Sequence, residues 1–349
     1  MAAALDTPPN PNLDWIHSEK GERCHGGWID VAAQAGPAGR DPAGRPAAAQ
    51  EAWPARPVRV VVPFAAGGGA DLVARAVSQR LTAQVGQQFV VDNRGGGAGN
   101  IGTDVVAKSP PDGYTLLITG PSHVINAHLF SRLSFDPRRD FTPVSLLTSA
   151  PYVLVASPEL PAQNLQELLA LARARPGALS YGSAGNGTAG HLAMELIKAA
   201  AGLDMVHVPY RGSPPLLTDL MAGRVAAGFD NVLSSAPGIE AGRLRALAVS
   251  GDRRAPALPQ VPTVAESGLP GFDVKVWQGA LFPAGVEAAI VNRLADEMRK
   301  AMQAPELQAR LRELGVEAIG SDAAAFAAFL EADDRRWGEG VRRSGARVD

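Results

Sequence analysis

The chain has 349 residues, about twice the usual size of one domain, so we expect two lobes. Hydrophobic residues make up 46% and charged residues 19%, which is typical of a soluble globular protein with a sizeable core. The net charge of −2 gives no strong field of either sign, which argues against nucleic acid and anionic membranes as partners.

Residues 1–52 are rich in Pro, Gly, Ala and Asn without a period of 2 or 3.6, and we interpret them as a disordered leader. They contain the single cysteine, Cys24, so neither an internal disulfide nor a cysteine metal cluster is expected. A basic start and an apolar stretch are missing, yet residues 46–52 resemble a signal-cleavage region. Two interpretations stay open: an export signal region whose start or reading frame is assigned wrongly, and a cytoplasmic protein with an unstructured tail.

From Trp53 onward, short β-branched runs alternate with amphipathic stretches, the pattern of α/β proteins. No apolar run approaches the roughly 18 residues that span a membrane, so we expect no direct membrane insertion. In the first part of the chain we predict strands at 58–62, 89–91 and 114–118, and helices at 71–85 and from the loop 93–102 to 108. This part therefore repeats a unit of strand, glycine-rich loop and helix.

The second part of the chain continues the alternation. We predict strands at 152–156, 179–181, 205–208, 226–229 and 244–249, and helices at 165–173, 189–201 and 214–222. After a proline-rich connection, residues 274–277 return to the first lobe, and three helices follow at 287–302, 305–314 and 322–337, the last with Ser321 as N-cap. We therefore predict lobe 1 from 53–155 and 278–349 and lobe 2 from 156–277, joined by a hinge around a central ligand cleft.

Glycine-bearing loops between strands and helices are the candidate binding elements. Ligands of open α/β sheets lie beyond the carboxyl ends of the strands, and helix N-termini present free N–H groups with a positive partial charge. Several such loops together attract a carboxylate or a phosphate without Arg or Lys. In the first loop we choose Phe64 and the backbone of Gly67, Gly68 and Gly69, and we expect Asp71 to cap the following helix.

The other loops supply further candidates. After the third strand, Ser122 is placed to donate to an anion, and His123 is either a ligand contact or a packed loop histidine. Around the loop 182–188, the hydroxyls of Ser183 and Thr188 suit a second carboxylate, together with Gly185 and His191, for which a surface or lobe-interface role stays open. At the next strand ends, Tyr210 is a cleft candidate, Arg211 contacts an anion or pairs at the surface, and Asp230 accepts from a ligand amine or hydroxyl or caps a helix.

These loops, in this order, resemble the Bug family, the TctC-like substrate-binding proteins of tripartite tricarboxylate transporters. The matching stretches are 60–71, 92–94, 100–103, 107–108, 111–115, 183–192, Val208-Pro-Tyr-Arg-Gly212, 219–223, 229–231, 242–248 and 261–272. The resemblance implies a periplasmic, non-enzymatic receptor with two lobes of the type II binding-protein kind and no cofactor. It also implies closure on a small carboxylate, such as a di- or tricarboxylate, an amino acid or an aromatic acid, and delivery to membrane permease subunits.

Three rival functions come from other classes. Gly185-Asn-Gly187-Thr-Ala-Gly190 matches the G-x-G-x-x-G pattern of dinucleotide-binding oxidoreductases, with Asp204 about twenty residues on. The acidic residue of that pattern closes the second strand, whereas Asp204 precedes it. Gly182-Ser183-Ala184-Gly185 lacks the G-x-S-x-G spacing of a hydrolase. A ligand sensor that feeds a signalling partner stays open.

Overall fold

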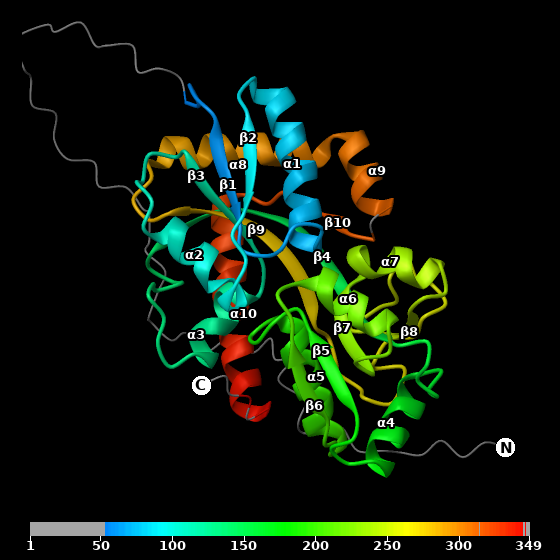
Figure 1. The fold of residues 1–349 in the computed structure, drawn as a ribbon. Coiled ribbons are helices and arrows are strands. Elements are labelled where there is room, and N and C mark those ends of the chain that lie inside the picture. The colour runs from blue at the N-terminus through cyan, green and yellow to red at the C-terminus, as the bar shows by residue number, and fades with distance from the viewer. Residues whose placement is uncertain (1–52, 314, 345, 347–349) are drawn as a thin grey trace, which may run out of the picture.

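A computed structural model describes residues 53–313, 315–344 and 346 of the chain. The leader predicted at 1–52, with Cys24, lies outside the described residues. Two groups of strands and helices lie side by side, and the long strands β4 (Phe141–Ala156) and β9 (Lys275–Pro283) run between them (Figure 1). The prediction of an α/β fold with two lobes is confirmed by this arrangement.

The first lobe is a mixed sheet covered by helices. Its strands run in the order β2 (Phe89–Asn93), β1 (Val58–Val62), β3 (Thr115–Thr119), β9 and β4, and β1 is parallel to both its neighbours. The short strand β10 (Glu317–Ala318) pairs with β4. The helices are α1 (Gly69–Val85), α2 (Asn100–Ala107), α3 (Ser122–Leu129), α8 (Ala288–Gln303), α9 (Pro305–Glu313) and α10 (Ala323–Ser344). Buried β-branched and leucine side chains such as Val60, Val77 and Leu117 form the core between the layers.

The second lobe is built around the end of β4. There β7 (Ala227–Asn231) and β8 (Arg245–Val249) pair with β4 antiparallel, and β5 (Ser180–Ser183) lies parallel between β7 and β6 (Val206–Pro209). The helices are α4 (Leu165–Ala174), α5 (Ala189–Ala201), α6 (Ser213–Met221) and α7 (Val232–Glu240). Because β5, β6 and β7 are parallel, their carboxyl ends and the helix starts that follow face the same edge of the sheet.

The hinge is visible in the pairing of β4. Residues from Phe141 to Pro151 pair with β9, whereas Tyr152 to Ala156 pair with β7 and β8. The pairing therefore changes partners at 151/152, and β9 begins at Lys275. The lobe limits at 155/156 and 277/278 stay predictions. The change of partner at 151/152 lies a few residues before the first limit, and the start of β9 at Lys275 lies a few residues before the second.

Most predicted elements are present. Helices α3 and α7, the first half of β4, the second part of β9 and the two-residue strand β10 were not predicted from the sequence. Pro237 and Gly238 inside α7, and Pro143 in β4, are residues that usually interrupt such elements. The α7 helix forms despite them, and the pairing of β4 with β9 shifts register beside Pro143.

Two predicted helix caps are wrong. The α1 helix begins two residues before Asp71, whose buried carboxylate instead accepts from the N–H of Gly67 at 2.8 Å. At α10, Asp322 accepts from the N–H of Ala325 at 2.7 Å, whereas the Ser321 hydroxyl accepts from the N–H of Leu146. In both places a neighbouring carboxylate or hydroxyl ties the start of the helix to the loop before it.

Gly279 on β9 leaves room for the ring of Phe326 on α10. A Cβ at this glycine would lie 2.1 Å from Phe326 Cζ, and Phe326 is fully buried. We expect Gly279→Ala to lower the free energy of unfolding by about 1–3 kcal/mol, because the ring must leave its packed position. Urea unfolding measures this loss. In the double variant Gly279→Ala/Phe326→Leu the loss should be smaller than the sum of the two single losses, and strict additivity would contradict the proposed clash.

Candidate functional site

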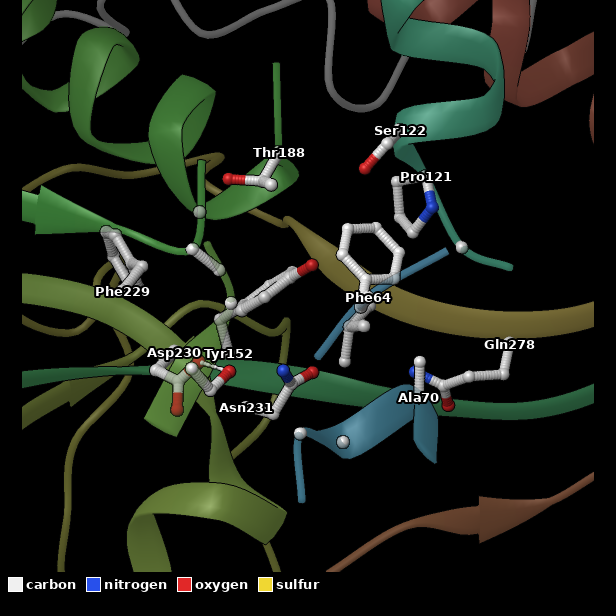
Figure 2. Close-up of a pocket in the computed structure, with 18 of the residues that line it drawn as sticks. Phe64, Ala70, Pro121, Ser122, Tyr152, Thr188, Phe229, Asp230, Asn231 and Gln278 are labelled. Atoms are coloured by element: carbon white, nitrogen blue, oxygen red, sulfur yellow. Dashed lines mark hydrogen bonds between the residues drawn. The ribbon is translucent and has the colours of Figure 1, made fainter. Parts of the chain in front are cut away.

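A cavity lies between the two lobes, against the hinge strands β4 and β9 (Figure 2). Its volume is about 60 Å³, which holds a few water molecules or one end of a small ligand. The walls come from both lobes: Phe64 and Ser122 belong to the first, and Thr188 and Phe229 to the second. A ligand held here would contact both lobes at once.

Five helices begin at this cavity. Its walls include the first residue of α1 (Gly69), of α3 (Ser122) and of α6 (Ser213), and the N-cap residues of α5 (Thr188) and α7 (Asn231). The first N–H groups of a helix have no partner within the helix, and the helix dipole adds a positive partial charge there. The arrangement therefore favours an anion, with two helices of the first lobe and three of the second converging on it.

The charged side chains of the site are few. Among the described residues that line the cavity, none is Lys, Arg or His, and one, Asp230, is acidic. Asp230 is almost fully buried, and its two carboxylate oxygens accept from the Ser213 hydroxyl at 2.5 Å and the Ser235 hydroxyl at 3.2 Å. Burial raises the pKa of Asp230 to about 6, although these hydrogen bonds oppose the shift. An anion here would be held by backbone groups and hydroxyls beside a carboxyl group of raised pKa.

The cavity brings together six of the residues selected from the sequence. They are Phe64, Gly68, Gly69, Ser122, Thr188 and Asp230. The Thr188 hydroxyl donates to the carbonyl of Gly185 at 2.8 Å and accepts from the N–H of His191 at 3.3 Å, so it also caps α5. Contact of these six residues with a ligand stays a prediction.

Three other selected residues shape the loops behind the wall. The N–H of Gly67 points to Asp71, and the carbonyl of Gly185 accepts from the hydroxyls of Ser183 and Thr188. Ser183 is fully buried, and its hydroxyl lies 2.7 Å from Nε2 of His207. The Ser183 side chain therefore supports the loop before α5 rather than lining the cavity.

The two selected histidines are packed side chains outside the cavity wall. His123 lies with Nε2 3.0 Å from the carbonyl of Pro137, and burial lowers its pKa to about 4. His191 stacks on His207 with ring centroids 4.1 Å apart and accepts from the N–H of Gly187 at 3.2 Å. Burial lowers the pKa of His191 to about 4 as well, so both rings are neutral near pH 7.

Tyr210 and Arg211 also lie away from the cavity. The Tyr210 hydroxyl donates to Asp219 at 2.8 Å, and Arg211 is exposed. The neighbouring residues Gly212 and Ser213 line the cavity instead. The strand end was located correctly from the sequence, but the residues that face the cavity are the next two along the chain.

Sequence reasoning missed two polar residues of the hinge strands, Tyr152 on β4 and Gln278 on β9. From the sequence, Tyr152 was placed in the apolar strand 152–156, and Gln278 directly after the returning segment 274–277. A glutamine within an apolar, buried strand was the available signal, because a buried polar side chain needs a hydrogen-bond partner. Tyr152 offers no such signal, since tyrosine is common in strands.

The lobes touch on both sides of the cavity, and glycines mark the contacts. A Cβ at Gly69 would lie 2.9 Å from Cγ of Asn231 in the other lobe, and a Cβ at Gly212 would lie 3.1 Å from Cβ of Ala65. On the α3 side, a Cβ at Gly187 would lie 2.3 Å from Oδ1 of Asn126. The lobes can approach this closely because these positions carry no side chain.

Within residues 53–313 and 315–344, no helix combines the length and the apolar composition that a membrane span requires. No cluster of three or more His, Cys, Asp or Glu side chains in the same residues is arranged to hold a metal ion.

Comparison with known proteins gives consistent matches. A sequence model described as "Tripartite tricarboxylate transporter family receptor" matches residues 73–345. A protein of Pseudomonas sp. strain P51, named "UPF0065 protein in tcbD-tcbE intergenic region", is 43% identical over 82% of this chain and 86% of its own. A protein of R. palustris solved with adipate has a TM-score of 0.83 and 39% identity, covering 85% of this chain and all of its own. The periplasmic binding protein BugD has a TM-score of 0.82 and 32% identity, with the same coverage.

Proposed function

Since this chain belongs to the tripartite tricarboxylate transporter receptor family, we propose that it captures a small carboxylate between its lobes and delivers it to membrane permease subunits. The observation that carries the proposal is the convergence of five helix N-termini from both lobes on a cavity whose described walls hold no cationic side chain. The adipate held by the R. palustris relative supports a carboxylate as the ligand class. The family is one of solute receptors rather than of enzymes.

The proposed mechanism is reversible closure. With the lobes apart, the N-termini of α1 and α3 and those of α5, α6 and α7 attract the anion from opposite walls. A carboxylate that contacts both walls binds the closed state better than the open one and shifts the population toward closure. Six residues are proposed to lie against the ligand: Phe64, Gly68, Gly69, Ser122, Thr188 and Asp230.

We expect a carboxylate to raise the thermal stability of the protein. The full chain is unfolded and refolded to remove any bound ligand and then heated with single members of a carboxylate panel. At 100 times its dissociation constant, a ligand adds about 2.7 kcal/mol to the free energy of unfolding. For a lobe-sized cooperative unit this corresponds to a rise in Tm of roughly 5–10 °C. A flat response to the whole panel together with a shift from a nicotinamide dinucleotide would instead favour an oxidoreductase.

We further propose that the protein works in the periplasm, as the family and the periplasmic relative BugD suggest. N-terminal sequencing of the native protein from its host tests this. A mature chain that starts near residues 50–53 in the periplasmic fraction supports the proposal, whereas a cytosolic chain with all of residues 1–52 contradicts it.

A further inference from the structure

A second cavity, larger than the one described above, lies beside the hinge strands. Its volume is about 350 Å³, and it shares none of its described lining residues with the first cavity. The first lobe contributes Arg312 at the end of α9 and residues 315–317, and the second lobe contributes the loop 251–256 after β8. The hinge strands add residues 149–151 of β4 and Lys275 of β9. The cavity has the size of a small-molecule site, and its walls come from both lobes.

The two lobes touch beside this second cavity. Gly315 lies in the turn between α9 and β10, and a Cβ there would lie 3.0 Å from Cγ1 of Val232, the first residue of α7 (Figure 1). Across the same boundary, Arg253 of the second lobe pairs with Glu317 on β10 at 3.4 Å. Separation of the lobes would pull these walls apart. The second cavity therefore keeps this shape only while the lobes are together.

Basic side chains predominate among the charged residues that line the second cavity. Four are basic and two are acidic: Arg253, Arg254, Lys275 and Arg312, against Asp252 and Glu317. Beyond the lining, Glu266 pairs with Arg254 at 3.0 Å and Asp273 pairs with Lys275 at 3.5 Å. Arg312 is exposed and forms no ion pair within the described part of the chain. Its charge is therefore available to an anionic ligand.

The ion pairs at this cavity can exchange partners at little cost. The side chains of Arg253 and Glu317 are 78% and 64% exposed. Those of Lys275 and Asp252, 3.1 Å apart, are 37% and 53% exposed. Ion pairs as open to water as these contribute little to stability. The acidic group of a ligand can therefore compete with Glu317 and Asp252 for these cations.

Between the charged groups the walls are apolar. Ala150, Ala255 and Val316 are buried, and Pro151 and Pro256 complete this part of the lining. A concave site with an apolar floor and a few charged groups suits a ligand that combines an apolar body with an acidic group. The first cavity is different in kind, because its described walls hold no cationic side chain and an anion there would meet helix N-termini.

We propose that the second cavity binds a small organic anion with an apolar body, and that this anion favours the closed lobes and strengthens capture in the first cavity. A ligand that contacts walls from both lobes binds the closed state better than the open one. Two such ligands raise each other's affinity by the same factor. The strengthening of capture rests on the proposed function, whereas binding in the second cavity does not.

Naphthalene-2-sulfonate serves as the probe, since it carries a negative charge on an apolar body. Titration calorimetry measures its dissociation constant for the ligand-stripped full chain, alone and with a saturating amount of the acid found by the thermal screen. We expect the acid to tighten binding of the probe about fivefold, and the probe to tighten binding of the acid by the same factor. Methanesulfonate keeps the acidic group and 2-naphthol keeps the apolar body, and each should bind about tenfold more weakly or worse.

Arg312→Gln and Arg310→Gln form a matched pair of variants on α9. Each removes one positive charge from an exposed position, but Arg310 pairs with Glu313 and does not line the cavity. Arg312→Gln should weaken binding of the probe about fivefold and leave the affinity for the acid alone unchanged. Arg310→Gln should change neither affinity. Tm confirms that both variants fold.

Four results would overturn the second site: no binding of the probe, its displacement by saturating acid, equal effects of the two substitutions, or binding of methanesulfonate as tight as that of the probe. Unchanged affinities when both ligands are present would overturn the effect on capture. If no acid of the panel binds, the proposed function fails and the effect on capture fails with it. The comparison of Arg312→Gln with Arg310→Gln then decides the second site on its own.

Discussion

Replacing Gly69 with leucine is expected to weaken carboxylate binding by about 100-fold or more while both lobes stay folded. Gly69 is the first residue of α1, and its backbone lies outside the left-handed region, so a side chain is sterically allowed there. The added Cβ, however, would lie 2.9 Å from Cγ of Asn231 on the opposite lobe. The substitution therefore opposes the approach of the lobes and leaves the helix intact.

Two measurements separate this effect from simple unfolding. Titration calorimetry with the acid identified by the thermal screen gives the loss of affinity, and small-angle scattering shows whether the ligand still contracts the molecule. The second substitution Asn231→Gly removes the side chain that the leucine meets, and glycine is tolerated at a helix N-cap. We expect the double variant to recover part of the affinity that Gly69→Leu loses. A Gly69→Leu protein that binds and contracts normally would show that this lobe contact plays no part in capture.

The fold was largely predictable because local patterns and the tertiary structure agree over most of the chain. The runs at 58–62 and 245–249 are short and β-branched or apolar, and the helices at 69–85 and 189–201 present one apolar face. The pattern fails where tertiary contacts override it. The α7 helix forms across Pro237, and β4 extends over sixteen residues through Pro143 because β9 pairs with it along the hinge.

The site was predictable at the level of loops but not of side chains. The loops that follow β1, β3, β5 and β6 all reach the cavity, and so do the last residues of β7, as expected for carboxyl ends of strands. Which side chain turns inward depends on neighbours far along the chain. Ser183 turns to His207, and Tyr210 to Asp219 in the following helix, whereas Ser213 reaches Asp230. These long-range pairings cannot be read from a single sequence. The sequence therefore could not show which of the hydroxyl-bearing side chains face the cavity.

Binding is expected to become tighter as the pH falls from 8 to 6, through Asp230. Its pKa is about 6 in the ligand-free protein, so at pH 8 the group is a buried carboxylate beside the cavity. A ligand carboxylate nearby raises that pKa further, and binding is then accompanied by uptake of a proton. The association constant should rise by up to about tenfold for each pH unit of this fall. Below pH 6 it should level off, until the ligand's own carboxyl group is protonated near about pH 4–5.

Asp230→Asn provides the matched neutral variant. The association constant of this variant should be nearly independent of pH between 6 and 8, and at pH 8 should exceed that of the wild type. Ser213→Ala should keep the pH dependence of binding but move it to higher pH. The reason is that the Ser213 hydroxyl lowers the pKa of Asp230, so the loss of this hydroxyl raises that pKa. Of the groups packed around Asp230, Ser213, Ser235 and Asn231 do not titrate in this range, and Tyr152 titrates far above it.

Asp230→Asn is also expected to change how the free energy of unfolding depends on pH. Asp230 has a pKa of about 6 when folded against 3.8 for the ordinary group, so between these values the folded state binds more protons than the unfolded state. The free energy of unfolding therefore falls as the pH rises from 4 to 6, by up to about 3 kcal/mol from this group. Asp230→Asn should abolish that fall and be the more stable protein at pH 8, with little advantage at pH 4. Urea unfolding at the two pH values decides this, and a variant that is less stable at pH 8 would mean that the hydrogen bonds to Ser213 and Ser235 outweigh the cost of burying the charge.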